Sequence, residues 1–237
     1  MRIVLTIFMY FFIYSIIGWV VESFFVMINT KKFVDRGFLI GPYCPIYGSG
    51  SILMIMYLTQ YKDNILTVFI LGLVICSLLE YLTSYFMEVL FKTRWWDYSD
   101  QKFNLNGRIC GQNCLLFGLG GIIVIYFIQP TLTNIFSSIP NNVLAFISVF
   151  SLIVFSIDFL ISLNVINKFK KTLTSVGLKK DSTQEFANAV KESIIRNNKF
   201  LQERLINAFP NINFNKLISI KNEIKEEIEE FINKIDD

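Results

Sequence analysis

The chain has 237 residues, a net charge of +3 and 53% apolar residues, among them 24 phenylalanines. This composition excludes an ordinary soluble domain, in which roughly 45–50% of residues are apolar, and so small a charge gives no indication of a nucleic-acid partner. The apolar residues stand in blocks of about 18 or more, which is long enough to cross a bilayer as helices. We therefore expect an all-α, polytopic membrane protein.

Charge is distributed unevenly along the chain. Residues 1–167 contain 9 Lys+Arg and 8 Asp+Glu, whereas residues 168–237 contain 13 and 11. Long apolar blocks with few charges are typical of membrane spans, and a charge-dense segment needs water. The sequence thus predicts a transmembrane domain over residues 1–167 and a soluble, helical, cytoplasmic tail over residues 168–237.

The first two predicted spans begin differently. Residues 3–21 form one apolar run, too long for a cleavable signal segment with roughly 7–15 apolar residues, so we expect it to remain as part of a first span over residues 3–28. The second span is expected to follow the turn-rich segment 37–45 and to end near Tyr61. Two prolines and two glycines in that segment disfavour a regular helix start and favour a broken or re-entrant backbone.

Three more spans are predicted over residues 65–91, 109–128 and 143–166, and Pro130 is expected to close the fourth. Cytoplasmic loops carry an excess of Lys and Arg. One set of loops holds only Arg2 and Lys62, so we predict five spans in the inner or plasma membrane, with the N-terminus outside and the tail in the cytoplasm. The basic residues assigned to the cytoplasmic side are Lys31, Lys32, Arg36, Lys92, Arg94, Lys102, Arg108, Lys168, Lys170 and Lys171.

Residues 37–48 and 107–118 share the pattern G-x-x-x-G-x-x-C-x-x-aromatic-G, offset by 70 residues. In each copy a membrane glutamate precedes a basic linker, Glu22 in the first copy and Glu88 in the second. Both copies are predicted two-span hairpins, so the repeat is parallel rather than inverted. Close helix packing would explain the glycines without any chemistry, and chance similarity is the alternative to duplication.

The tail shows two helical patterns. Residues 182–185, Ser-Thr-Gln-Glu, form a capping box, after which a helix is expected to run to about Phe209 and stop at Pro210. A second amphipathic helix is expected from about Asn215. These helices serve either as a docking or coiled-coil module or simply pack on each other.

Four acids fall within the predicted spans: Glu22, Glu80, Glu88 and Asp158. Glu80 is the deepest, about eleven residues from the end of its span, or roughly 16 Å at 1.5 Å per residue. A charge at this depth costs several kcal/mol unless it is paired, protonated or in contact with water. Two interpretations stay open, namely buried ion pairs that lock the hairpins together, and a substrate- or ion-binding cavity.

For the cavity, the candidate site residues are Glu80, Glu22, Arg108, Arg36, Arg94, Asp97, Glu88 and Asn106. A helix N-terminus beside Arg108 would favour an anionic ligand. Trp95 and Trp96 suit either interfacial anchoring or a rigid loop over the site.

Several chemistries are excluded. The chain has no histidine, and its four cysteines form no CxxC motif, so neither a zinc site nor a histidine-based catalytic triad is expected. A phosphate-binding G-x-x-x-x-G-K-[ST] motif is missing, so ATP-driven transport would need a separate ATPase subunit. We expect no enzymatic activity, no cofactor and no metal.

Two groups of motifs carry a family resemblance. The first runs from Gly18-Trp19 and Glu22 through residues 36–48, and the second covers residues 93–99 and 103–110. Over roughly residues 7–165 the chain resembles a family of bacterial multi-span proteins labelled putative ABC-transporter type IV permeases. The resemblance implies an integral membrane location and a transport role, with no substrate attached.

We therefore expect a non-enzymatic transport component with a polar cavity near its cytoplasmic side. Its expected partners are the lipid bilayer, a separate ATPase subunit or another protein bound at the tail, and a second copy of the chain. The alternative is a membrane scaffold or regulatory protein whose buried charges are structural and whose tail binds a partner.

Overall fold

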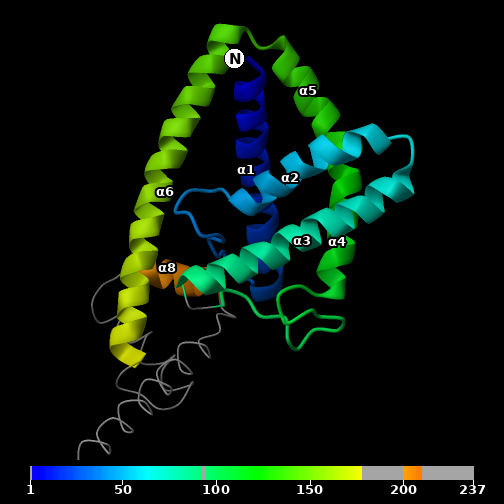
Figure 1. Cartoon of the computed structure of the whole chain (residues 1–237). Coiled ribbons are helices and arrows are strands. Elements are labelled where there is room, and N and C mark those ends of the chain that lie inside the picture. The colour runs from blue at the N-terminus through cyan, green and yellow to red at the C-terminus, as the bar shows by residue number, and fades with distance from the viewer. Residues whose placement is uncertain (1, 92–93, 178–199, 210–237) are drawn as a thin grey trace, which may run out of the picture. The chain divides into compact units, whose positions relative to one another are not determined.

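The computed structural model describes residues 2–91, 94–177 and 200–209 (Figure 1). Within these residues there are helices and one isolated bridge, Leu105 to Ile109, but no strand. They form two compact units: the described parts of Met1–Thr83 and Tyr98–Ser162 make the first unit, and those of Ser84–Asp97 and Leu163–Asp237 make the second. The expected all-α fold class is confirmed.

Four helical segments of the described chain are long and apolar enough to cross a membrane. They are α1 (Arg2–Thr30), α3 (Ile65–Phe91), the continuous run of α4 (Gly111–Ile123), η2 (Val124–Ile128) and α5 (Gln129–Ser138), and α6 (Asn141–Gly177). The bounds of α3 are those predicted. α6 passes through residue 167 without a break, so the domain boundary proposed there remains a prediction.

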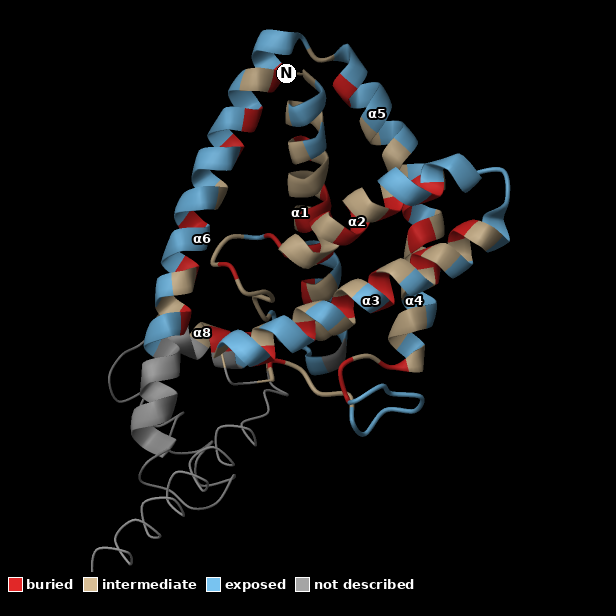
Figure 2. Cartoon of the chain, viewed as in Figure 1, coloured by how far each residue is buried: buried red, intermediate tan, exposed pale blue. Residues whose placement is uncertain are grey.

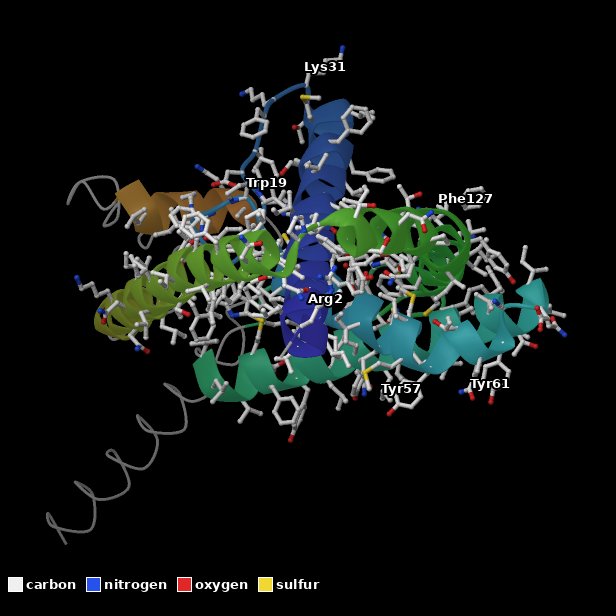
Figure 3. All side chains as sticks on the ribbon, turned by 90° about the horizontal axis from the view of Figure 1, so that it is seen from above. Arg2, Trp19, Lys31, Tyr57, Tyr61 and Phe127 are labelled. Carbon is white, nitrogen blue, oxygen red and sulfur yellow. The ribbon has the colours of Figure 1, made fainter. Side chains whose placement is uncertain are left out.

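Large apolar side chains on these helices are exposed. Phe146 and Leu160 on α6 are 74% and 64% exposed, and Figure 2 shows exposed residues along most of α6 with buried ones at intervals. Tyr57, Tyr61 and Phe127 likewise project outward (Figure 3). In water such a surface would be an association site, whereas acyl chains solvate it. The composition, the helices and this exposure describe a multi-pass membrane protein.

The helix at the expected second span has the predicted bounds and is short. Helix α2 (Pro45–Leu58) has 14 residues and is extended only by the 3₁₀ turn η1 (Thr59–Tyr61). Cys44 precedes a proline and has extended backbone angles, φ −113° and ψ 98°, because the proline ring disfavours the helical region for the residue before it. The segment ahead of α2 is non-helical, so the span begins only at Pro45.

A contact at the start of α1 bears on the number of crossings. The Arg2 guanidinium donates to the Asn141 side chain and to the carbonyls of Phe136 and Ile139, the latter two at 2.7 and 3.1 Å. Residues in contact at helix ends lie on one side of a membrane, so the chain crosses an even number of times between them. α1, α3 and the α4–α5 run are each long enough to cross, and the predicted count of five spans, which also needs α2 to cross, stays a prediction. Which side is cytoplasmic stays a prediction.

Pro130 does not end the fourth span, contrary to expectation. The helix widens to a π-turn at η2 and continues to Ser138. The Gln129 N–H reaches back five residues to the Val124 carbonyl. Proline lacks an N–H and its ring collides with the carbonyl four residues earlier in a regular α-helix. The wider π-turn accommodates that defect and lets the helix continue past Pro130.

Small residues allow the helices to approach closely. A Cβ on Gly48 of α2 would lie 2.3 Å from Ser15 Oγ and 2.4 Å from the Phe11 carbonyl oxygen on α1. Gly72 of α3 and Gly121 of α4 meet in the same way, with a Cβ on either one 3.4 Å from the Cα of the other. Helix association in lipid depends on such close packing. The two hairpins are therefore held by van der Waals contact between backbones.

The two repeat copies share some local features and differ in others. Gly37 and Gly107, at equivalent positions, both have positive φ, 111° and 66°, a conformation that glycine adopts without cost. The second helix starts at Pro45 in the first copy but at Gly111, the equivalent of Gly41, in the second. Copy one contains prolines in this stretch and copy two has none, so α4 begins one turn earlier.

The described parts of the tail are the end of α6, up to Gly177, and α8 (Phe200–Ala208), which ends one residue before Phe209, the predicted last residue of that helix. Within the second unit, Phe209 packs edge-on against Trp95, with the ring centroids 5.1 Å apart. Trp95 is only 2% exposed, so it is a core residue rather than an interfacial anchor. The predicted capping box at 182–185 and the helix from Asn215 lie outside the described residues.

Candidate functional site

Glu22, in the last third of α1, forms one half of the candidate site in the first unit. Its carboxylate accepts a hydrogen bond from the Tyr47 hydroxyl of α2, and its Oε2 atom lies 3.5 Å from the Arg36 guanidinium. The Tyr47 ring lies over Gly18, where a Cβ would come within 2.3 Å of the ring. Glycine at position 18 is therefore what allows the phenol to reach Glu22, one turn further along α1.

The linker that carries Arg36 is fastened to α1. The chain leaves α1 through Lys31, which has a φ of 54°, and passes back beside Trp19 (Figure 3). The Trp19 indole N–H donates to Asp35 Oδ1 at 2.8 Å. This bond places Arg36, the next residue, within reach of Glu22.

Glu80 of α3 forms the other half of the site and is 8% exposed. The Tyr98 hydroxyl donates to its Oε1 atom at 3.3 Å, and the Asn113 side chain of α4 lies close to both Glu80 and Tyr98. The second carboxylate oxygen, Oε2, is buried and has no hydrogen-bond partner among the described residues. Leaving such an acceptor unsatisfied costs about 1–3 kcal/mol, and more when it is charged.

The two halves form one cluster. Glu22 and Glu80 interact electrostatically with each other, and the phenols of Tyr47 and Tyr98 each interact with both acids. Burial raises the pKa of Tyr98 further above its ordinary value, so the phenol keeps its proton and can donate it to Glu80. We call Glu22, Tyr47, Glu80, Tyr98 and Asn113 the acidic cluster.

The loop before α4 positions Tyr98. The Tyr98 N–H donates to the Gly107 carbonyl at 2.8 Å, and the Gly107 N–H donates to Asn104 Oδ1 at 3.1 Å. Asn106 and Gly107 both have positive φ, 53° and 66°, which asparagine and glycine tolerate best. The Asn-Gly pair thus turns the chain and returns it to the segment that starts at Tyr98.

Asn106 and Arg108 gather around Tyr81, the residue after Glu80. Asn106 Nδ2 donates to the Tyr81 hydroxyl at 3.0 Å, and the Arg108 guanidinium lies 5.7 Å from the centre of the Tyr81 ring. A guanidinium within about 6 Å of an aromatic ring gains a cation–π attraction. Arg108 is buried and Asn106 is exposed, so these two candidates surround an aromatic ring in the structure.

Glu88, Arg94 and Asp97 lie in the second unit and contact one another. Arg94 Nε lies 3.1 Å from Glu88 Oε2, and its Nη1 atom lies 3.6 Å from Asp97 Oδ1. One arginine thus bridges two acids across the end of α3 and the segment that follows it. This geometry suits an ion pair that orders a loop.

Asp158 of α6 has a fully satisfied carboxylate. Its Oδ1 accepts from the Ile40 N–H at 3.0 Å and from Ser162 Oγ at 2.8 Å, while its Oδ2 accepts from the Gly41 N–H and the Tyr43 hydroxyl, both at 2.6 Å. The carboxylate therefore fastens the segment before α2 to α6. An open hollow of about 370 Å³ lies over this junction and is otherwise lined by apolar side chains.

The list of candidate site residues predicted from the sequence did not include Tyr47, Tyr98 or Asn113. Tyr47 is the aromatic residue of the repeated pattern, and Tyr98 ends the Trp-Trp-Asp-Tyr motif. Both residues therefore lie in motifs that were interpreted as a repeat and as a loop, not as a source of hydrogen bonds to the acids. Asn113 had no distinguishing signal. In the described part of the chain no group of three or more His, Cys, Asp or Glu side chains could hold a metal ion.

A comparison of the sequence with known protein families agrees with the family resemblance of its motifs. A family model described as Putative ABC-transporter type IV matches residues 9–163, which include the whole acidic cluster. Neither a curated protein nor a solved structure matches this chain. The matched residues make up more than half of the chain and leave the tail outside. The chain therefore belongs to the family described as Putative ABC-transporter type IV.

Proposed function

We propose that this protein is the membrane-embedded component of a transport system and that the acidic cluster is the polar site for its substrate. Family membership supports a transport role. The observation that carries the proposal is the buried Glu80 Oε2 atom, which lacks a hydrogen-bond partner among the described residues. A binding site keeps such an atom for its ligand, whereas a structural acid is satisfied within the fold.

Comparison with the other membrane acids supports this distinction. Asp158 accepts four hydrogen bonds, and Glu88 lies 3.1 Å from an arginine nitrogen. Those two carboxylates are explained by the structure they hold together. Glu80 receives a hydrogen bond on one oxygen and none on the other, so folding alone does not account for it.

The role we propose is not enzymatic. The cluster consists of carboxylates, phenols and an amide, with no nucleophile paired with a base. Because the sequence has no nucleotide-binding motif, ATP-driven transport would require a separate ATPase subunit. In the predicted orientation Glu22 and Glu80 lie in the cytoplasmic halves of their spans, so the site would open toward the cytoplasm.

Transport can be tested in liposomes that contain the purified protein, with and without an ATPase subunit from the same genome. The probes are ²²Na⁺, ⁸⁶Rb⁺ and a mixture of ¹⁴C-labelled amino acids. The variant is Glu80→Gln, and the matched control is Asp100→Asn, an exposed acid of the loop before α4.

We expect uptake of at least one probe by the wild type and by Asp100→Asn, and loss of that uptake in Glu80→Gln protein whose circular dichroism is unchanged. If none of the probes enters above the level of protein-free liposomes, or if Glu80→Gln transports as well as the wild type, the proposal is wrong. The scaffold alternative, in which the buried charges are structural, would then account for the satisfied carboxylates of Asp158 and Glu88.

A further inference from the structure

The charge around Glu80 limits what its site can hold. Glu22 lies beside the Arg36 cation and accepts a hydrogen bond from Tyr47. The groups closest to Glu80 are two neutral polar side chains, the Tyr98 phenol that donates to it and the Asn113 amide, together with the second acid. With Glu22 compensated by Arg36, one negative charge remains at Glu80. A ligand with a single positive charge neutralises it, whereas a divalent ion would leave an uncompensated positive charge in an apolar surrounding.

The atoms that the acidic cluster offers as ligands further limit which cation can bind there. The cluster offers carboxylate, phenol and amide oxygens, and the chain contains no histidine. Oxygen ligands suit hard cations, while transition metals favour imidazole and thiolate. Cys76 lies in electrostatic range of Glu80, but a neutral thiol is a poor ligand for a hard cation. The described residues also form no group of three acids that would suit Ca²⁺.

We propose that Glu80, Tyr98 and Asn113, with Glu22 beside them, bind a single alkali cation, Na⁺ or K⁺. The Glu80 Oε2 atom, nine-tenths buried and without a hydrogen-bond partner in the described chain, supplies the principal contact. The inference rests on the proposed function, since it names the class of ligand that the same site takes.

Binding is an exchange with a proton. When the site is empty, the buried Glu80 carboxyl without a counter-charge holds a proton, because an isolated carboxylate is too costly in an apolar surrounding. When the cation binds, that proton leaves to the solvent and the cation takes its place, so the charge inside is unchanged. The titratable and charged groups facing Glu80 are Glu22 with its partner Arg36, Tyr47, Cys76 and Tyr98.

The first test is thermal unfolding of the purified, full-length protein in detergent. NaCl or KCl replaces N-methylglucamine chloride at constant ionic strength and pH, since a ligand that binds only the folded state raises Tm in a saturable manner. We expect a rise of several degrees for the wild type and for Asp100→Asn, and none for Glu80→Gln, whose amide imitates the protonated carboxyl. Tyr98→Phe removes one oxygen ligand and should raise the half-saturating concentration about tenfold.

The second test follows Glu80 itself. Dicyclohexylcarbodiimide reacts with protonated carboxyl groups in apolar surroundings, and mass spectrometry of the Glu80 peptide measures the rate. At a cation concentration about ten times Kd, roughly a tenth of the sites remain empty, so the reaction should be about tenfold slower. N-methylglucamine should not slow the reaction.

Any of three results would overturn the inference. In the first, the Tm and the carbodiimide rate of the wild type respond to pH but to neither Na⁺ nor K⁺, which would show that the site holds a proton only. In the others, Glu80→Gln keeps the cation-dependent rise in Tm, or N-methylglucamine slows the carbodiimide reaction as much as Na⁺ does. Because binding is measured without transport, the two proposals fail separately. A cation that binds while no probe crosses the membrane supports the inference and refutes the proposed function.

Discussion

Asp158→Asn tests how the segment before α2 is held. Each Asp158 oxygen accepts two hydrogen bonds: Oδ1 from Ile40 and Ser162, and Oδ2 from Gly41 and Tyr43. Asparagine keeps one oxygen and replaces the other with an NH₂ group, which is a donor. Two of the four bonds are lost, and the two donors that made them then face another donor.

The expected cost follows from the number of bonds lost. A hydrogen bond to a charged group contributes about 1.5–3 kcal/mol, so losing two should destabilise the protein by about 3 kcal/mol at the low end. For a chain of this size, 1 kcal/mol corresponds to about 2–4 °C in Tm. We therefore expect Tm to fall by about 6–12 °C.

The assay combines thermal unfolding in detergent with limited trypsin digestion. Trypsin cleaves after Lys31, Lys32 and Arg36, in the linker that leads to the fastened segment, and we expect faster cleavage there in Asp158→Asn. Ser162→Ala is the control, because it removes only one of the four donors and should cost about 1.5 kcal/mol at the same low end, half the loss expected for Asp158→Asn. An Asp158→Asn protein with the Tm and digestion rate of the wild type would show that the carboxylate does not hold the segment.

Two further predictions concern packing. Gly48→Ala should destabilise the protein by about 1–3 kcal/mol, because the new Cβ would meet Ser15 and the Phe11 backbone at 2.3–2.4 Å. The control is Gly120→Ala, where nothing lies within 4 Å of the new Cβ, and it should be neutral or stabilising by up to about 1 kcal/mol. Equal Tm values for the two variants would contradict this packing. Trp95→Ala should destabilise the protein by about 3–5 kcal/mol and speed trypsin cleavage at Arg204, because Trp95 is buried against Phe209. The control is Trp96→Ala, at a half-buried position, which should destabilise the protein less. Unchanged cleavage at Arg204 in Trp95→Ala would refute the contact.

Hydropathy was sufficient to place α3, whose predicted bounds are those observed. It was less reliable where proline was concerned, because proline's effect depends on the surrounding backbone. Before Pro45 the chain stays extended, as the local steric rule requires. At Pro130 the same residue is accommodated by a π-turn, which the sequence gives no means of choosing over a helix end.

The candidate site was predicted in part. Glu22 and Glu80 were predicted because they are acidic residues within apolar spans, and the structure places them in one cluster. The same reasoning grouped Glu88, Arg94 and Asp97 with them, although these three contact one another in the second unit. Charge and side of the membrane are readable from a sequence, but the partner of a charge depends on the rotation of each helix about its axis.

The sequence by itself determined that this is a multi-span helical membrane protein, where most of its helices lie and to which family it belongs, because burial in lipid demands long apolar helices whatever their arrangement. Only the tertiary structure decided that Asp158 is satisfied by four hydrogen bonds while one oxygen of Glu80 has no partner in the described chain. Both are acids within apolar spans, and their difference depends on which backbone and side-chain donors the fold brings to each carboxylate.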